Sequence, residues 1–458
     1  MRLRPTLALA AFAFALGSLD ARAAVRVPAT PGALARALSA TSEGDTLVLA
    51  AGVHRGPVRI ERRLTLRGEA GAVIEGPRAG TVIAIAANGS VVEDVDVRGS
   101  GARVLTVDSG IRVIRAANVA IRRVRFEDVL YGVYAERAAD LAIERCTFVG
   151  RVPPMKEDGE GNGIHLWYCA DPRLVANDVQ RFTDGIYLSF VDRAHVEANV
   201  LHDCGRYGLH TMYCQRNDLV ANRFLTNVAG CAIMFSNHLR VERNDFWRNR
   251  GPRTYGLLLR DCSDGEFTNN RMVDNTIAAF LDNSNRNRFR GNLVQDNGWG
   301  LLIFASCAQN EVAGNDFVNN DYPVALDMKY TTNRFDDGEQ GNYWSEHAPY
   351  DLDGDRRGDV PYSPVTAFAF VSKQYPDLSV LAKSPAVAAL GVAERVVPAL
   401  RPSEAVDRHP RVTPVAVTGT GHALERPDGA RASWGARFAF AALFTGGLAG
   451  FVRRRRSA

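Results

Sequence analysis

The sequence predicts an all-β protein: a single-stranded, right-handed parallel β-helix wound from coils of about 22 residues. Two markers recur at this step, and the segments between them lack the periodicity of amphipathic helices. The first marker is an asparagine placed two residues before an apolar residue. Subtracting neighbouring positions gives steps of 22, 23, 22, 26, 22 and 23 residues for Asn177, Asn199, Asn222, Asn244, Asn270, Asn292 and Asn315.

The second marker is a glycine followed by alternating apolar residues, and it keeps the same step. Its spacings are 22, 23, 22, 26 and 44 residues, and the last covers two coils with Ala278 in the skipped place. The glycines are Gly163, Gly185, Gly208, Gly230, Gly256 and Gly300. Short alternating segments rich in Val, Ile and Phe, with Asn, Asp and Gly between them, indicate strands joined at tight corners. Leucine-rich repeats share the period, but they need helical turns and more leucines.

Stacked coils place equivalent residues directly above one another. Parallel strands in neighbouring coils lie about 4.8 Å apart. Parallel crossovers are almost always right-handed, which predicts the direction of winding. The corner asparagines are therefore expected to form a structural ladder, each amide bonding to its counterpart in the next coil.

The N-terminal residues 1–23 have the layout of a cleaved signal peptide. Arg2 and Arg4 precede an apolar run, and Ala21-Arg22-Ala23 forms a cleavage site. The β-helix domain is predicted over residues 24–383. A short helix over 31–40 is expected to cap the first coil, because an open end exposes apolar side chains and unpaired strand edges.

The remaining segments interrupt or follow the coils. Residues 151–161 form a polar insertion that is expected to project as a loop. After about residue 335 the pattern becomes irregular, and the Pro/Ala-rich residues 384–435 are predicted to be a linker. Residues 436–452 are apolar or small, and the four arginines in the basic C-terminus 453–458 follow them. A membrane-anchoring tail is the first interpretation, and a processed sorting signal is the second.

Charge and cysteine content exclude several classes of function. The formal net charge of +4 is small for 458 residues and gives no reason to expect a nucleic-acid partner. Seven cysteines occur without a CxxC pair, which argues against zinc ribbons and thioredoxin-like chemistry. An odd number of cysteines leaves at least one thiol free, bound by a partner or bound to a metal; several are also suited to fill the coil interior.

Alternation after each glycine assigns side chains to the two faces of a strand. The second and fourth residues are expected to point outward. His210, Met212 and Met234 should therefore lie within one or two coils on one exposed face, with His165 and Trp167 two coils away. Met155 in the insertion could fold over them. Imidazole and thioether groups are soft ligands suited to transient Cu(I) binding, so His165, His210, Met212 and Met234 form a candidate copper site.

A second interpretation of this strip is an apolar docking patch for another protein. Tyrosine, tryptophan and methionine side chains gathered on one face are typical of such surfaces. Residue types alone favour the docking patch over the copper site.

An acidic turn near the C-terminal end is a candidate structural Ca²⁺ site. Asp351, Asp353, Asp355 and Asp359 can gather oxygen ligands. Arg356 and Tyr362 stand where an EF-hand requires glycine and an acid, so a solvated acidic turn is an equal alternative.

Carbohydrate-active enzymes are the main competing class for an exported β-helix. Polysaccharide lyases, epimerases and hydrolases need an acid with a partner on one face. The candidates Asp184, Asp203, Asp261 and Asp282 are scattered over several coils. Asp171-Pro172-Arg173 lacks the histidine of the Asp-Pro-His motif that alginate epimerases carry. The pattern therefore favours a non-enzymatic role. An anchored surface adhesion protein is a further alternative.

The C-terminal block of the repeat region resembles the NosD family. The matching residues are Gly341-Asn342-Tyr343-Trp344-Ser345, Tyr350 to Asp355, Gly358 to Tyr362, Tyr375 to Leu378 and Ser384-Pro385-Ala386. The blocks Gly44-Asp45-Thr46 and Leu64 to Gly68 also fit, and the resemblance covers roughly residues 30–390. NosD proteins are periplasmic β-helical accessory proteins for nitrous oxide reductase maturation.

The resemblance implies a role in copper-centre assembly. Its implied partners are the membrane and ATPase subunits of an ABC transporter, a copper-donor lipoprotein and nitrous oxide reductase itself. No individual ligand is transferred from the family, because the matching motif is structural. The family role raises the expectation that the His/Met strip serves copper transfer or partner docking.

Overall fold

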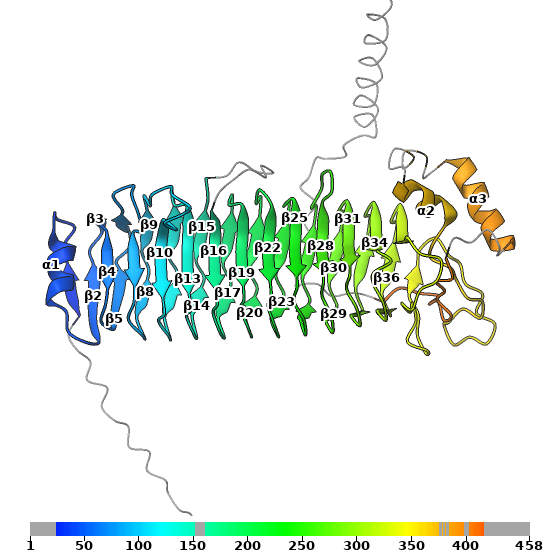
Figure 1. Cartoon of the computed structure of the whole chain (residues 1–458), viewed down its shortest axis with the longest axis horizontal. Helices are drawn as coiled ribbons and strands as arrows, with labels where there is room; N and C mark the ends of the chain where they lie inside the picture. Colours follow the sequence, from blue (N-terminus) through cyan, green and yellow to red (C-terminus); the bar gives the residue numbers. More distant parts are fainter. Residues whose placement is uncertain are drawn as a thin grey trace, which may run out of the picture. The chain divides into compact units, whose positions relative to one another are not determined.

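The computed structural model describes residues 24–151, 161–374, 378, 381, 384–397 and 403–415. These residues form a β-helix of about 14 turns with about 23 residues per turn, built from three parallel sheets (Figure 1). The predicted fold class is confirmed. The predicted signal peptide 1–23, most of the 151–161 insertion and the predicted tail 436–458 lie outside the described residues.

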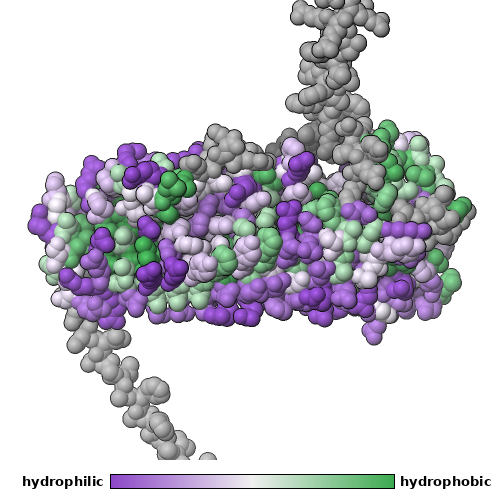
Figure 2. Space-filling view, viewed as in Figure 1, coloured by the Kyte–Doolittle hydropathy of each residue, from purple (hydrophilic) through white to green (hydrophobic). Residues whose placement is uncertain are grey.

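Sheet A has a charged outer surface, which forms the hydrophilic lower edge in Figure 2. Its outward arginines and acids pair between coils, as Arg240 does with Asp218 at 2.9 Å. Its strands in order are β1 (Val25–Val27), β2 (Asp45–Leu49), β5 (Leu64–Gly68), β8 (Val91–Glu93), β11 (Ala120–Arg122), β14 (Ala142–Glu144), β17 (Arg173–Val175), β20 (His195–Glu197), β23 (Asp218–Val220), β26 (Arg240–Glu242), β29 (Glu266–Thr268), β32 (Arg288–Arg290) and β35 (Glu311–Ala313).

Sheet B supplies the aromatic part of the interior. Phe126 stacks on Phe148 at 4.5 Å between ring centroids, and Phe317 stacks on Trp344 at 4.4 Å. Its strands are β3 (Gly52–Arg55), β6 (Ala72–Glu75), β9 (Asp96–Arg98), β12 (Arg125–Glu127), β15 (Thr147–Val149), β18 (Asp178–Gln180), β21 (Val200–His202), β24 (Arg223–Leu225), β27 (Asp245–Trp247), β30 (Arg271–Val273), β33 (Leu293–Gln295), β36 (Asp316–Val318) and β38 (Tyr343–Trp344).

Sheet C contains the longest strands and the second sequence marker. Most of these strands carry a glycine at their second position. They are β4 (Val58–Ile60), β7 (Ile83–Ile85), β10 (Ser109–Ile114), β13 (Tyr131–Glu136), β16 (Asn162–Trp167), β19 (Asp184–Ser189), β22 (Tyr207–Met212), β25 (Ala229–Met234), β28 (Tyr255–Arg260), β31 (Ile277–Asp282), β34 (Trp299–Ile303) and β37 (Tyr322–Leu326).

The predicted asparagine ladder runs through the interior of one corner. Asn222 is fully buried; its Oδ1 accepts from the Asn199 amide at 2.9 Å, and its own Nδ2 donates to Asn244 Oδ1 at 3.0 Å. The same pattern joins the asparagines from Asn177 to Asn342. Each amide satisfies backbone groups that a tight buried corner would otherwise leave unpaired.

The seven cysteines are buried and unpaired, which confirms that they fill the coil interior. Burial raises the pKa of Cys214 to about 11, so its sulfur is a neutral thiol near neutral pH. At one corner, cysteines alternate with other residues from coil to coil: Cys169, Val191, Cys214, Ser236, Cys262, Ser284 and Cys307. Neighbouring coils therefore never place two thiols together at this corner.

Helix α1 (Ala33–Ala40) caps the N-terminal end of the stack, as predicted (Figure 1). Ala33 and Leu34 of this helix are buried, and the helix contacts β1, β3 and β4. The cap covers apolar side chains of the first coil that would otherwise meet solvent.

Residues 403–415 close the opposite end. Asp407 is fully buried and accepts hydrogen bonds at 2.8 Å from the backbone N–H of Asn342 and from Nε1–H of Trp344. Arg411 is buried and forms an ion pair with Asp316. The asparagine ladder thus ends on a carboxylate supplied by a segment far along the chain.

The predicted linker over 384–435 is wrong for its described residues. Ser384 caps helix α3 (Pro385–Val396) by accepting from the Val387 amide at 3.3 Å, and Pro385 occupies the first turn. Glu394 of α3 accepts from the backbone of α2 (Ala367–Gln374), so the two helices pack together. High Pro/Ala content marked a helix start here instead of a linker. Residues 398–402 and 416–435 lie outside the described part.

Among the described residues, no helix is both long and apolar enough to cross a membrane. The apolar stretch 436–452 falls outside this part of the chain, so its role as an anchor remains a prediction.

Candidate functional site

The predicted His/Met strip lies on the outer face of sheet C, across strands β16, β19, β22 and β25. One column of paired residues contains His165, Tyr187 and His210 in register. The neighbouring column contains Met212, which pairs directly with Met234 in the next coil. The sequence-based placement of these side chains on one face is confirmed.

Aromatic contacts pack the first column tightly. The His165 and Tyr187 rings lie 4.6 Å apart, and the Tyr187 and His210 rings lie 4.7 Å apart. The Tyr187 hydroxyl donates to Met212 Sδ at 3.4 Å, which links the two columns. Imidazole, phenol and thioether groups therefore form one cluster.

The prediction of an exposed strip is wrong for His210, whose residue is only 6% exposed. Tyr187 and Tyr207 cover its ring, with the Tyr207 ring 4.9 Å away. His165, Met212 and Met234 are half-buried. Large side chains on adjacent strands shield one another even on the outer face of a sheet.

His210 contacts the carboxylate of Asp184, which Arg206 also binds. Asp184 is fully buried and accepts two hydrogen bonds from the Arg206 guanidinium, at 2.9 and 2.6 Å. His210 Nδ1 lies 3.2 Å from Asp184 Oδ2. Burial alone would raise the pKa of Asp184, but hydrogen bonds from His210 and Arg206 outweigh it and lower that pKa. The carboxylate is therefore ionised at neutral pH and accepts a hydrogen bond from the protonated Nδ1 of His210.

This arrangement fixes the tautomer of His210. With a proton on Nδ1, Nε2 is the ring nitrogen that is left to bind a metal. His210 Nε2 is buried and has no hydrogen-bond partner. A histidine whose Nδ1–H is bonded to a carboxylate while Nε2 is free has the arrangement found in most histidine metal ligands.

His165 has the opposite arrangement. Asn162 Oδ1 accepts from the Asp184 amide at 3.2 Å, which orients its Nδ2 toward His165 Nδ1 at 3.0 Å. His165 Nδ1 is thus the acceptor, and the proton is on Nε2. Burial lowers the pKa of His165 to about 4, so this ring is neutral at pH values above that range. His210 is therefore better prepared than His165 to bind a metal.

Sequence reasoning treated Asp184 as one of several scattered acids and missed its partnership with His210. Strict alternation assigns Asp184 to the interior. The alternation breaks at Gly185, where a side chain would meet the Gly208 carbonyl oxygen at 2.6 Å. The residue before each such glycine consequently faces outward, as the contact between Tyr207 and His210 shows. A polar residue directly before the repeated glycine was the available signal.

Comparisons with known proteins assign the chain to a family. Residues 149–349 match the family model described as "Periplasmic copper-binding protein (NosD)". A relative from Pseudomonas aeruginosa, named "Probable ABC transporter binding protein NosD", is 30% identical over 382 residues, covering 79% of this chain and 87% of the relative. The chain belongs to the NosD family.

Two further comparisons agree with this assignment and with the fold. A NosD relative of the same name from Stutzerimonas stutzeri is 29% identical over 378 residues, covering 79% of this chain and 85% of the relative. The crystal structure of the Dettilon tailspike protein matches with a TM-score of 0.50 and 14% identity, covering 66% of each chain. This second likeness concerns the β-helix alone.

The acidic turn of this NosD-family chain lies just beyond the matched residues. Asp351, Asp353 and Asp359 each offer an oxygen within 4.8 Å of the others. Asp355 is not in this group; its carboxylate accepts from the Arg357 amide at 2.8 Å. Three of the four predicted Ca²⁺ ligands are therefore brought together, and Ca²⁺ binding remains a prediction.

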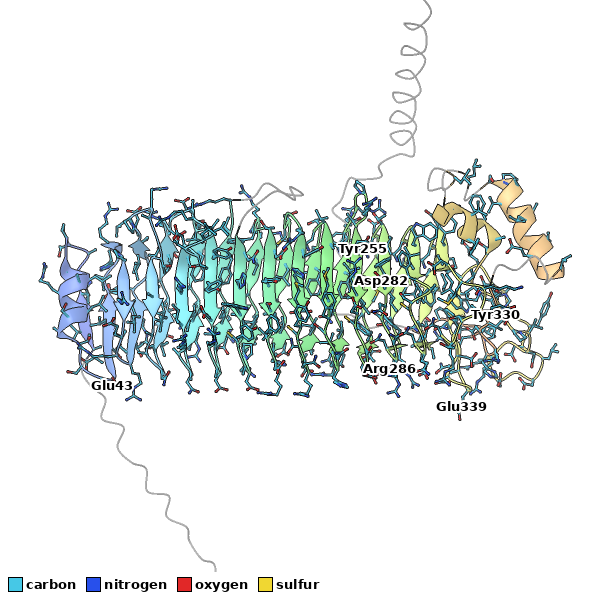
Figure 3. The ribbon with its side chains drawn as sticks, in the orientation of Figure 1. Glu43, Tyr255, Asp282, Arg286, Tyr330 and Glu339 are labelled. Carbon is cyan, nitrogen blue, oxygen red and sulfur yellow. The ribbon has the colours of Figure 1, made fainter. Side chains whose placement is uncertain are left out.

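The other acids singled out for the enzyme alternative are engaged by neighbours. Asp203 Oδ2 contacts His202 Nδ1 at 2.8 Å. Asp282 pairs with Arg260 at 3.2 Å, and Asp261 accepts from the Asn283 amide. Figure 3 labels Asp282 and Tyr255 on β31 and β28 of sheet C. These acids come from different elements and share no common cluster with Asp184.

Proposed function

We propose that this NosD-family protein is a periplasmic accessory factor that handles Cu(I) during maturation of the copper centre of nitrous oxide reductase. The family description as periplasmic and copper-binding supports the location and the metal. The names of the two curated relatives support association with an ABC transporter.

The observation that carries the proposal is the state of His210. Its Nδ1 lies 3.2 Å from Asp184 Oδ2, and its Nε2 is buried without a hydrogen-bond partner. An unpaired buried polar atom costs free energy, so its retention calls for a ligand. A copper ion bound at Nε2 would satisfy this atom.

The thioethers of Met212 and Met234 supply the other proposed ligands. The two residues are in register on adjacent strands, which lie about 4.8 Å apart. Cu(I) prefers thioether and imidazole groups, whereas Mg²⁺ and Ca²⁺ prefer oxygen. His165 is placed beside the proposed ligands and not among them, because Asn162 fixes its proton on Nε2.

The seven thiols are poor candidates for the copper site. They are buried inside the coils, and burial raises their pKa values, for example to about 11 for Cys169. A thiol binds metal as the thiolate, which is scarce at neutral pH in these surroundings.

In the proposed pathway, a copper-donor lipoprotein passes Cu(I) to this cluster, which then presents it to nitrous oxide reductase. The membrane and ATPase subunits of an ABC transporter complete the assembly. The ion is cargo in this scheme, and the soft, neutral ligand set allows it to leave again.

An anaerobic Cu(I) titration against a competing chelator, bicinchoninate, tests the proposal. The wild type is expected to bind one ion per chain. Residues that only hydrogen-bond to a metal ligand already contribute about 10- to 100-fold to metal affinity. Removing the ligand itself in His210→Ala should therefore weaken Cu(I) binding by about a hundredfold or more. Met212→Leu with Met234→Leu should have a similar effect.

Matched controls are available on the same chain. His195→Ala removes a half-buried imidazole from sheet A, and Met328→Leu removes a half-buried thioether outside the cluster. Both should bind Cu(I) like the wild type. Equal affinity for the wild type, His210→Ala and the double methionine variant would reject the copper site.

A further inference from the structure

Four aromatic residues occupy the same corner in four successive coils. Tyr168, Phe190, Tyr213 and Phe235 each follow directly after a sheet C strand, and we name them the aromatic ridge. Neighbouring rings stack nearly parallel, with centroids 4.6, 5.0 and 4.9 Å apart.

The backbone at these positions is in the left-handed region, which bulky residues rarely adopt. The φ angles lie between 51° and 56°. Among the described non-glycine residues with positive φ, these are the ones that are Tyr, Phe or Trp. Asparagine and aspartate tolerate this conformation better. The four aromatic residues therefore occupy positions that the local backbone disfavours.

The fold itself does not require aromatic residues at this corner. The preceding coils place Arg115 and Arg137 there, and the following coils place Asp261 and Asn283 there, all with φ between 47° and 54°. Strained residues of this kind concentrate at functional sites. Among the described residues, aromatic side chains occupy this corner only in the four coils that contain the His/Met cluster.

The aromatic ridge adjoins the proposed copper ligands. Tyr213 directly follows Met212 and Phe235 directly follows Met234, while Trp167 lies 5.2 Å from the Tyr168 ring. Tyr168, Phe190 and Tyr213 are 45%, 39% and 44% exposed. The ridge is thus an exposed apolar strip beside the His/Met cluster.

We propose that the aromatic ridge is the docking surface for a folded copper-carrying protein that exchanges Cu(I) with the His210 cluster. This inference rests on the proposed function. Exposed aromatic residues that pack together are typical centres of protein interfaces. Four rings at about 4.8 Å spacing extend over about 14 Å, which suits the centre of a protein interface.

The two ends of the ridge present an arginine and an aspartate, and each already contacts a neighbour: Arg137 pairs with Glu136 at 2.7 Å, and Asp261 accepts from the Asn283 side chain. The Arg137 guanidinium lies over the Trp167 and Tyr168 rings at 5.7 and 5.6 Å. Asp261 occupies the same corner at the other end. The proposed partner should place an acidic group near Arg137 and a basic group near Asp261, in competition with these neighbours. A sugar chain fits less well, because the ring faces that would receive it are covered by neighbouring rings.

The double variant Phe190→Asn with Tyr213→Asn tests the ridge in the full chain, because asparagine accepts the left-handed backbone. The probe is the soluble domain of the copper-donor lipoprotein, metal-free and Cu(I)-loaded, measured by biolayer interferometry. Association should weaken about tenfold or more. The thermal midpoint should be unchanged or raised, and Cu(I) affinity against bicinchoninate should be unchanged. Tyr330→Asn, at a 69% exposed site labelled in Figure 3, should associate like the wild type.

A second variant keeps the aromatic ridge intact, and its thermal midpoint is compared with that of the wild type. Arg137→Glu leaves the four rings in place and should weaken association with the same probe. Wild-type association by both variants would overturn the proposal, as would a self-association that the double variant abolishes, since the occupant would then be a second copy. Chelator competition reports on the His210 cluster alone, so failure of copper binding is distinguishable from failure of docking.

Discussion

The imidazole of His210 and the carboxylate of Asp184 meet across neighbouring coils, with Nδ1 and Oδ2 separated by 3.2 Å. In Asp184→Asn, Oδ1 is expected to stay with Arg206 while Nδ2 donates to His210 Nδ1. The proton then moves to Nε2, as in the existing pair of Asn162 and His165. Cu(I) affinity should fall about 10- to 100-fold in chelator competition.

The control for this substitution is Asp171→Asn. Asp171 pairs with Arg193 at 2.6 Å on the exposed surface. Its loss should change neither Cu(I) affinity nor stability measurably, because exposed ion pairs contribute little. If Asp184→Asn also retains wild-type affinity, the carboxylate does not set the tautomer that metal binding uses.

The asparagine ladder predicts a large stability cost at a single interior position. In Asn222→Ala, the Asn199 amide loses its acceptor, and the Asn244 Oδ1 and Val196 carbonyl oxygens lose a donor. Leaving several buried polar groups unpaired should lower the free energy of unfolding by about 3 kcal/mol or more. Urea denaturation measures it.

A half-buried asparagine serves as the comparison for Asn222. The side chain of Asn237 makes one hydrogen bond between coils, in which its Oδ1 accepts from the backbone N–H of Ser263 at 2.8 Å. Asn237→Ala should cost about 1 kcal/mol. A similar cost for the two variants would mean that the ladder adds little beyond one hydrogen bond.

Asp407 predicts a pH dependence at the C-terminal end. Burial raises the pKa of Asp407 to about 6 from an ordinary value of 3.8. The folded state therefore binds the proton more strongly than the unfolded state. This contribution to stability is fully present below about pH 4 and is lost as the pH rises through about 6.

Hydrogen exchange measures this effect directly. Corrected for intrinsic rates, protection of residues 336–344 and 403–415 should rise between about pH 7 and about pH 5. In Asp407→Asn this rise should be absent. A rise of equal size in the variant would assign the effect to other groups.

Calcium is predicted to bind the acidic turn through three of its four aspartates. Added Ca²⁺ should raise the thermal midpoint of the wild type, because a ligand that binds only the folded state stabilises it. Asp351→Asn and Asp359→Asn should remove the shift. Asp355→Asn should retain it, because Asp355 lies outside the group of close oxygens. No shift in the wild type would leave a solvated acidic turn.

Much of the fold was predictable because individual residues mark the same position in successive coils. Asn177 to Asn315 mark one corner, and their step predicted the coil register that pairs Met212 with Met234. Side-chain direction followed from alternation within each strand. The capping helix over 31–40 was predictable because an open end must be covered.

The parts that could not be predicted depend on contacts between distant residues. Alternation failed at Gly185, so the role of Asp184 was missed. Residues 403–415 lie beyond the repeat, and nothing in their local sequence indicates that Asp407 completes the ladder at Asn342. The aromatic ridge was not predicted, because residues at the corners between strands were expected only to form turns. The signal was nevertheless present, since the spacing of one coil separates Tyr168, Phe190, Tyr213 and Phe235.

The alternation of Cys214, Ser236 and Cys262 at one corner has a consequence for biogenesis. Thiols in every second coil are about 9.6 Å apart, beyond the reach of a disulfide, whose α-carbons must lie within about 7 Å. The folded chain therefore has no native disulfide to form in an oxidising compartment. Its maturation should then require protection of nascent thiols until the coils close, and should be indifferent to loss of a disulfide isomerase.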